Sequence, residues 1–284
     1  MNLFRLPDFN NVTAGGTATL KLPKYMLTWC RLVLTLGGTF TKAQIDSIKI
    51  KLGSRVVWSV DTFAGTSGGS YLDRINKYLG RYDQVGNISI DFTERDFGNI
   101  VANQVGAYDL TDLTDDVFIE IKINAAAVNP TLYALGAFTP PQTKPGQPTN
   151  QAPLQKLVSV PFQLNTGGRF YLPFDPRGAI VKRGYFMFGG TTGSGLNDAN
   201  LNKVEIKKDG TVVFDPREAD FRFVQQEYKK VPQAQMYVMD FVYDNNLSSA
   251  LATADATSLE FITNFTATDQ GVAYFEVLDK PLNL

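Results

Sequence analysis

Two groups of carboxylates have the spacing that could support acid–base chemistry: Asp91, Glu94 and Asp96, and farther along the chain Glu218 and Asp220. Glycosidases use such a pair, one carboxyl group as the acid and the other as the base or nucleophile. Carboxylates this close in sequence are equally ordinary in solvated turns. The chain contains no histidine, which excludes Ser-His-Asp and Cys-His nucleophile systems and histidine metal sites. We therefore predict no catalytic residue, no cofactor-binding residue and no enzyme.

Hard oxygen ligands gather at two further places, which are Asp112, Asp115 and Asp116, and Asp244, Asn245 and Asn246. Neither group follows the twelve-residue pattern of a calcium loop. Both fit turn formation or helix capping, so we predict no metal-ligating residue, and only a structural calcium ion at a subunit contact stays open. The single cysteine, Cys30, cannot form an internal disulfide.

Two glycine-rich segments, Gly189–Gly195 and Gly65–Ser70, resemble a phosphate-binding loop only in glycine content. They lack the Lys-Ser/Thr ending and a clear following helix, so we interpret them as loops. The aromatic side chains include Trp29, Trp58 and Phe214 at alternating strand positions. That placement predicts core packing rather than a platform for stacking sugars.

The charge balance argues against a nucleic-acid-binding module. The chain has 27 Lys+Arg and 28 Asp+Glu, and neither half is basic, so direct sequence-specific binding of nucleic acid is not expected. Residues 1–55 hold eight basic and two acidic side chains, whereas residues 83–120 hold nine acidic ones and only Arg95. We expect these segments to become neighbouring strands that neutralise one another. A face polarised toward a charged partner, such as lipid headgroups, is the alternative.

No apolar segment reaches the roughly 18 residues that a membrane-spanning helix requires. The longest, Met26–Leu36, is interrupted by Arg31. The opening Met1–Asn10 lacks the apolar stretch and cleavage site of a secretory signal, which makes cytoplasmic synthesis the expectation. Leu3, Phe4, Leu6 and Phe9 of this segment suit either an arm that packs on a neighbouring subunit or a segment that packs on its own domain.

The apolar residues alternate with a period of two, which predicts an all-β protein. In Val117–Ile123 the odd positions are all Val or Ile, whereas the even ones include Glu120 and Lys122. Similar runs lie at Leu32–Leu36, Ile48–Leu52, Ile88–Phe92, Phe170–Phe174, Met236–Phe241, Leu259–Phe261 and Val272–Tyr274. Two short amphipathic helices are predicted, one around Leu72–Leu79 and one around Phe221–Tyr228.

The second half of the chain repeats the first. At an offset of 152 residues Leu20 falls on Leu172 and Arg31 on Arg183, and at 156 residues Ile45–Trp58 falls on Leu201–Phe214. Tyr78 of the first predicted helix matches Tyr228 of the second at an offset of 150. Ordered blocks with nearly constant offset indicate an internal duplication.

A proline-rich connector, Thr139–Pro153, separates the two copies and favours an extended conformation. We expect an N-terminal jelly roll at residues 1–138, a linker at 139–155 and a C-terminal jelly roll at 156–284. Each is predicted to have eight strands with short helices in the loops. Immunoglobulin-like sandwiches are the rival, but they are usually nearer 100 residues and rarely need such long loops.

The motif Leu6-Pro7, the segment Asn11–Gly16 and the sequence Leu20-Lys21-Leu22-Pro23, followed by the Ile48–Val57 hairpin, resemble the start of the major coat protein of corticovirus-type phages. These are tailless, icosahedral viruses that contain a membrane. The resemblance implies a double jelly-roll major capsid protein without a cofactor, located in the virion. It further implies homotrimeric, pseudo-hexagonal capsomers that contact neighbouring trimers, minor and vertex proteins and an internal membrane.

Two other functional classes stay open at this point. A tandem jelly-roll carbohydrate-binding protein or adhesin would use the aromatic residues and glycine-rich loops. A glycosidase would depend on Asp91 or Glu94.

Overall fold

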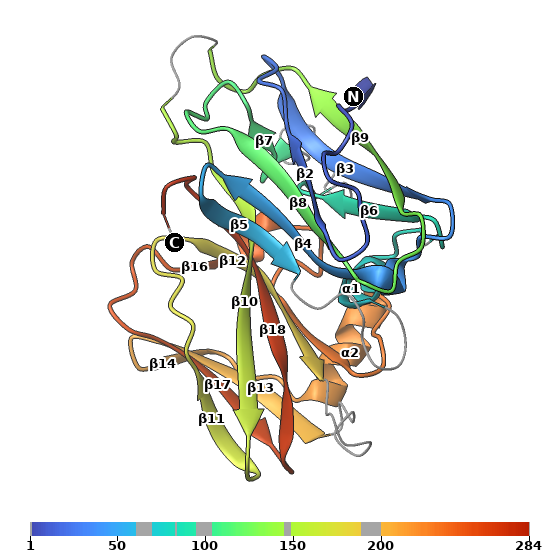
Figure 1. The fold of residues 1–284 in the computed structure, drawn as a ribbon. Helices are drawn as coiled ribbons and strands as arrows, with labels where there is room; N and C mark the ends of the chain where they lie inside the picture. Colours follow the sequence, from blue (N-terminus) through green and yellow to red (C-terminus); the bar gives the residue numbers. More distant parts are fainter. Residues whose placement is uncertain are drawn as a thin grey trace. The chain divides into compact units, whose positions relative to one another are not determined.

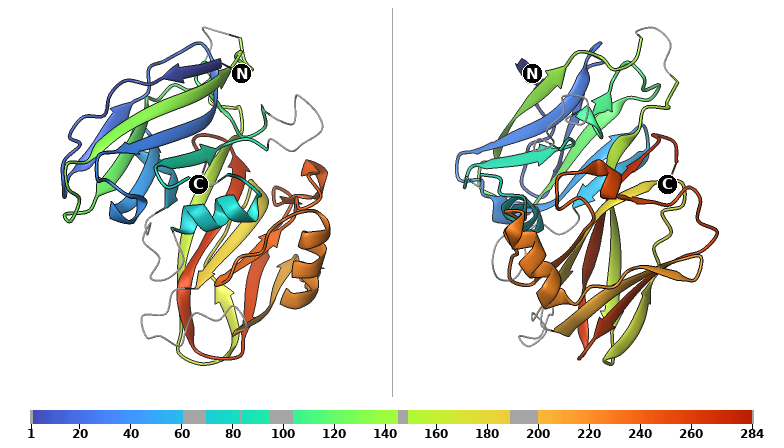
Figure 2. Two further views of the ribbon diagram at one scale, coloured as in Figure 1. Left: turned by 90° about the vertical axis from the view of Figure 1, so that its right-hand side faces the viewer. Right: turned by 180° about the vertical axis from the view of Figure 1, so that it is seen from behind.

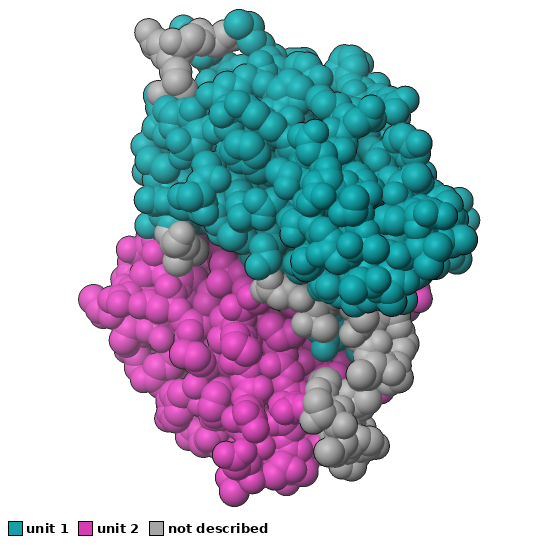
Figure 3. Space-filling model, viewed as in Figure 1, with its two compact units in different colours: residues 1–76, 82–157, 278–284 teal, residues 77–81, 158–277 magenta. Residues whose placement is uncertain are grey.

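The computed structural model describes residues 2–60, 70–82, 84–94, 104–144, 149–188 and 200–283, which form two compact units. Figure 3 colours unit 1 (residues 1–76, 82–157 and 278–284) and unit 2 (residues 77–81 and 158–277). Asp96, the loop Gly189–Gly195 and residues 65–69 of the other glycine-rich segment lie outside the described residues. No helix in these ranges is long and apolar enough to cross a membrane.

Unit 1 is built from two antiparallel sheets (Figure 1). One has the strand order β1-β9-β3-β6, with the short β7 also paired to β3, and the other has the order β2-β8-β4-β5. The elements are β1 (Asn2–Arg5), β2 (Thr17–Lys21), β3 (Thr28–Gly37), the 3₁₀ turn η1 (Lys42–Gln44), β4 (Ile45–Leu52), β5 (Arg55–Val60), α1 (Tyr71–Tyr78), β6 (Asn87–Asp91), β7 (Tyr108–Asp109), β8 (Val117–Ile123) and β9 (Thr131–Thr139).

Unit 2 repeats this plan, as Figures 1 and 2 show. Its sheets have the orders β10-β18-β12-β15, with β16 paired to β12, and β11-β17-β13-β14. The elements are β10 (Leu154–Leu164), β11 (Gly168–Leu172), β12 (Ile180–Phe188), β13 (Leu201–Lys208), β14 (Thr211–Phe214), α2 (Glu218–Glu227), β15 (Met236–Asp240), the 3₁₀ turn η4 (Leu247–Ser249), β16 (Leu251–Ala252), β17 (Leu259–Phe265) and β18 (Asp269–Asp279).

The strand registers confirm the duplication residue by residue. Ile50 pairs with Ile119 between β4 and β8, and at the expected offset of 156 Ile206 pairs with Phe261 between β13 and β17. The bulge after Ile50 in the β4–β5 hairpin recurs after Ile206 in the β13–β14 hairpin. A β-bulge places one extra residue in one strand of a pair, and its position is usually kept within a protein family. The recurrence of the bulge indicates that the two units are copies of one fold. In the described residues each unit has eight longer strands, as expected of a jelly roll, and one two-residue strand, β7 or β16.

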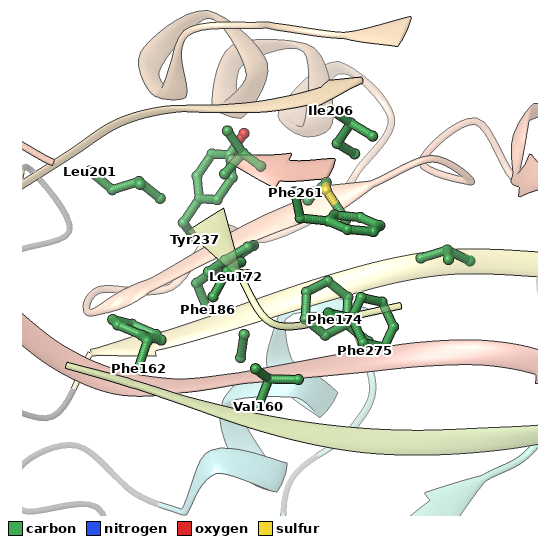
Figure 4. Close-up of a cluster of buried hydrophobic side chains, with 14 of the residues drawn as sticks. Val160, Phe162, Leu172, Phe174, Phe186, Leu201, Ile206, Tyr237, Phe261 and Phe275 are labelled. Atoms are coloured by element: carbon green, nitrogen blue, oxygen red, sulfur yellow. The ribbon is translucent and has the colours of Figure 1, made fainter. Parts of the chain in front are cut away.

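The core of unit 2 lies between its two sheets and is rich in phenylalanine (Figure 4). Phe275 of β18 stacks on Phe174 with 3.8 Å between ring centroids, and Phe261 of β17 meets both rings. In unit 1 the expected alternation holds along β8, where Ile119, Ile121 and Ile123 are buried and the residues between them are partly exposed. Period-two patterning therefore places the apolar residues of each strand on one face.

The first segment of the chain is part of its own jelly roll. Strand β1 pairs with β9 from Asn2–Phe138 to Arg5–Leu135, and Leu6 is buried. The alternative in which this segment packs on its own domain is confirmed for β1, Leu6 and Phe9, whereas Leu3 and Phe4 stay exposed. Residues Asn2–Arg5 form an edge strand of the unit 1 sheet, where pairing with β9 satisfies their backbone hydrogen-bonding groups.

Candidate functional site

Two of the carboxylates considered for catalysis, Asp91 and Glu218, form ion pairs with arginines. Asp91 lies opposite Arg31 in the β3–β6 ladder, and its Oδ1 is 3.2 Å from the Arg31 Nε. Glu218 forms an ion pair with Arg222 one turn later in α2, and Asp220 is exposed. The acidic and basic segments neutralise one another as expected, since Lys51 also pairs with Glu120 at 2.7 Å.

The first group considered for calcium fastens the proline-rich connector. Asp112 Oδ1 accepts hydrogen bonds from the backbone N–H and hydroxyl of Thr149, and Oδ2 accepts from the N–H groups of Gln151 and Ala152. Burial alone would raise the pKa of Asp112, but these four donors outweigh burial and lower it. The sequence signal was present in the acidic cluster, but the partner lies 37 residues away and could not be assigned.

Asp109 fastens the connector at a second point, which sequence reasoning missed. Its Oδ2 accepts from the backbone N–H and hydroxyl of Thr143, at 2.8 and 2.7 Å. Asp116 instead pairs with Lys21 at 2.7 Å, and this hydrogen bond lowers the pKa of the Asp116 carboxyl. Within the described part of the chain, no three Asp, Glu or Cys side chains are grouped so that they could hold a metal ion.

The second group considered for calcium forms turns. Asp244 accepts from the N–H of Asn246, which in turn caps η4 by accepting from the N–H of Ser248. Asn245 accepts from the Lys230 ammonium. The bonds of Asp244 and Asn246 are the local side-chain-to-backbone bonds expected of Asp and Asn in turns.

The predicted core aromatics are confirmed. Trp29 and Trp58 are buried, and Trp29 packs against Phe92 and Tyr108. Phe214 packs edge to face on Phe221. The two tryptophans cannot serve as an exposed platform for stacking sugars, and Phe214 is partly buried against the core of unit 2.

Exposed apolar and charged side chains gather on the side of the β1-β9-β3-β6 sheet that points away from the unit 1 core. We call it the N-terminal outer face, and it consists of Leu3, Arg5, Arg31, Val33, Thr35, Asn87, Ser89, Asp91, Tyr133 and Leu135. Leu3 is 67 % exposed and Tyr133 is 47 % exposed. The Arg5 guanidinium lies over the Tyr133 ring at 5.2 Å. Exposed apolar residues rimmed by charged ones are typical of protein–protein contacts.

The corresponding face of unit 2 is buried and carries a network of charges. Arg183 Nε donates to Asp240 Oδ1 at 3.1 Å, and Arg183 Nη1 donates to Glu276 Oε2 at 3.3 Å. Lys182 pairs with Glu276 at 2.6 Å, and Tyr78 OH donates to Asp240 Oδ2 at 2.8 Å. In these contacts two cations, Lys182 and Arg183, face two carboxylates, Asp240 and Glu276. Burial, reinforced by the Asp240 charge, raises the pKa of Tyr78 and keeps it protonated as the donor.

The Arg183–Asp240 pair of unit 2 is equivalent to the Arg31–Asp91 pair of unit 1. Arg183 lies opposite Asp240 in the β12–β15 ladder, just as Arg31 lies opposite Asp91 in the β3–β6 ladder. The two outer faces are thus copies of one surface, one open and one closed. Two jelly rolls of this strand order in tandem define the class of double jelly-roll viral capsid proteins.

Family models assign the chain within that class. The viral coat protein P2 N-terminal domain matches residues 4–139 and the viral coat protein P2 C-terminal domain matches residues 154–281, so the chain belongs to the viral coat protein P2 family. As a member of this family it is a structural viral coat protein and not an enzyme. The family resemblance predicted from the sequence is confirmed. No match was found among curated protein sequences.

Solved structures share the fold along nearly the whole chain. The major capsid protein P2 of bacteriophage PM2 matches with a TM-score of 0.81 and 21 % identity, covering 98 % of this chain and 97 % of that one. The STIV major capsid protein matches with a TM-score of 0.73 and 16 % identity, covering 98 % and 96 %. A quasi-atomic model of the PBCV-1 virus capsid matches with a TM-score of 0.56 and 11 % identity, covering 100 % and 95 %.

Proposed function

We propose that the chain forms homotrimers that act as pseudo-hexagonal capsomers of an icosahedral shell around an internal membrane. The observation that carries this proposal is the duplicated strand register, because two copies of one jelly roll in each chain give three chains six similar flanks. Six similar flanks tile a hexagonal lattice with a single kind of chain.

The assembly needs no catalytic residue, metal ligand or cofactor. Its partners are further copies of the chain, first within a trimer and then between trimers, together with minor and vertex proteins and the membrane. The chain is made in the host cytoplasm before it enters the virion. A structural calcium ion at a subunit contact remains an addition that this function does not require.

Light scattering on the purified protein tests the proposal. The chain has a mass of 31.3 kDa, so a trimer has a mass three times larger, about 94 kDa. Permanent interfaces often bury more than 2,000 Å² in total, so the trimer should persist on dilution to micromolar concentration. A stable monomer over that range would refute the proposal. Negative-stain images should show particles with three-fold symmetry and a hexagonal outline.

A further inference from the structure

The two helices occupy equivalent places on their own sheets. Asn76 of α1 donates through Nδ2 to the Ser89 carbonyl at 3.0 Å, and Gln225 of α2 donates through Nε2 to the Val238 carbonyl at 2.7 Å. The donors Asn76 and Gln225 are 149 residues apart, and so are the acceptors Ser89 and Val238. The match of Tyr78 with Tyr228 at an offset of 150 is therefore wrong by one residue, and Tyr78 corresponds to Glu227.

The turns that end the helices agree with this register. The N–H of Gly80 bonds to the Lys77 carbonyl after α1, and the N–H of Lys229 bonds to the Gln226 carbonyl after α2. Gly80 and Lys229 both have a positive φ, of 65° and 61°. The ends of α1 and α2 are thus copies of one backbone.

The equivalent helices differ in exposure. Tyr71, Arg74 and Tyr78 of α1 are all buried, and Tyr78 reaches Asp240 on the closed outer face of unit 2. At the positions of α2 that correspond to Arg74 and Tyr78, Phe223 is 61 % exposed and Glu227 is also exposed. We call the exposed residues Phe223, Gln226, Glu227, Tyr228 and Val231 the α2 tip.

The N-terminal outer face is thus open and the α2 tip is exposed, whereas inside unit 2 Tyr78 contacts Asp240 and Tyr185. Unit 2 includes Lys77–Arg81 at the end of α1, and its outer face is closed. On the copy of that face in unit 1, the Arg31 side chain is 31 % exposed and Leu3, Tyr133 and Leu135 reach solvent. The partly exposed Arg31 is paired with the buried Asp91, so the match between the two surfaces rests on their apolar groups. The exposed aromatic rings of the α2 tip match the exposed apolar residues of the face.

We propose that the α2 tip of one chain docks on the N-terminal outer face of a second copy of the chain. Glu227 then lies over Arg31 and Val33, as Tyr78 lies over Arg183 and Tyr185 in unit 2, where the Tyr78 and Tyr185 rings are 6.3 Å apart. This head-to-tail contact, repeated three times, closes a ring. The inference rests on the proposed trimer and specifies the surface that holds it together.

Disulfide trapping tests the contact. Glu227→Cys and Val33→Cys, combined in one chain, should give covalent trimers on a non-reducing gel after mild oxidation, and each single variant should stay monomeric on the gel. The native Cys30 is buried and common to all variants. The matched control combines Val33→Cys with a cysteine at Val213, an exposed residue of β14, and should not cross-link.

A second variant pair measures the energy of the contact. Phe223→Ala should weaken trimer association about tenfold or more, because a large aromatic side chain buried at an interface often contributes that much. Tyr171→Ala, which truncates an aromatic side chain of β11 that is 57 % exposed, should leave the trimer intact.

The outcomes separate the two proposals. A monomeric wild-type protein would refute the trimer itself. A wild-type trimer that neither cross-links through positions 33 and 227 nor weakens with Phe223→Ala would refute this contact and leave the trimer standing.

Discussion

Replacing Tyr78 by phenylalanine removes one hydroxyl group from the buried charge network of unit 2. That hydroxyl donates to Asp240 Oδ2 at 2.8 Å, and both residues are fully buried. Asp240 keeps its bonds from Arg183 Nε and from the backbone N–H of Val242, both to Oδ1. Oδ2 loses a charge-assisted hydrogen bond, and a bond to a charged group contributes about 1.5–3 kcal/mol. We expect Tyr78→Phe to lower the free energy of unfolding by about that amount.

Tyr237 provides a matched control in the same unit. It is buried to the same degree, but within the described residues its hydroxyl has no hydrogen-bond partner. Tyr237→Phe removes the same atom without breaking a bond, so it should be neutral or slightly stabilising. The difference in unfolding free energy between the two variants therefore measures the contribution of the Tyr78–Asp240 hydrogen bond, separate from the effect of removing a buried oxygen atom.

Urea denaturation followed by far-ultraviolet circular dichroism measures both variants. All samples must be compared at one protein concentration, because subunit association adds to the apparent stability. The two tryptophans lie in unit 1, so their fluorescence would not report on this network directly. Equal unfolding free energies for Tyr78→Phe and Tyr237→Phe would refute the assignment of a stabilising role to this bond.

Three further predictions concern individual residues. Asp112→Asn should lower the free energy of unfolding by about 2 kcal/mol at neutral pH and speed proteolysis of the connector. The reason is that only one of the two terminal atoms of an amide side chain accepts hydrogen bonds, whereas both oxygens of Asp112 do. The pKa of the Asp112 carboxyl is lowered in the folded protein, so its contribution to the free energy of unfolding is fully present above the ordinary pKa of 3.8 and is lost as the pH falls through the lower folded pKa. The difference in unfolding free energy between wild type and Asp112→Asn should therefore become smaller in acid. A difference that does not change with pH would contradict this. Burial raises the pKa of the Cys30 thiol, so Ellman's reagent should react only after unfolding, and rapid reaction of the native protein would show the site to be open. Gly271→Ala should cost more than about 2 kcal/mol in thermal or urea unfolding, because its Cβ would lie 2.0 Å from the Met187 carbonyl oxygen, whereas Gly86→Ala meets only an ordinary contact; similar losses for both would disprove the clash.

The sequence was sufficient for the local plan of each jelly roll. Alternating apolar residues predicted β8 correctly, because the period of a strand is a property of neighbouring residues. The hairpin offset of 156 also agrees with the structure, bulges included. The helix offset was one residue off, since Tyr78 and Tyr228 are similar in type, whereas the backbone hydrogen bonds equate Tyr78 with Glu227.

The sequence alone determined the all-β class, the duplication and the absence of histidine-based chemistry, since composition and periodicity carry that information directly. Tertiary structure decided which charges meet. Arg183 lies 57 residues from Asp240 and 93 from Glu276, and Asp112 binds a connector that seemed independent of it. Tertiary structure also decided that the outer face of unit 2 is buried and that of unit 1 is open. Burial depends on which segments pack together in space, whereas the two copies of the strand pattern look alike in sequence.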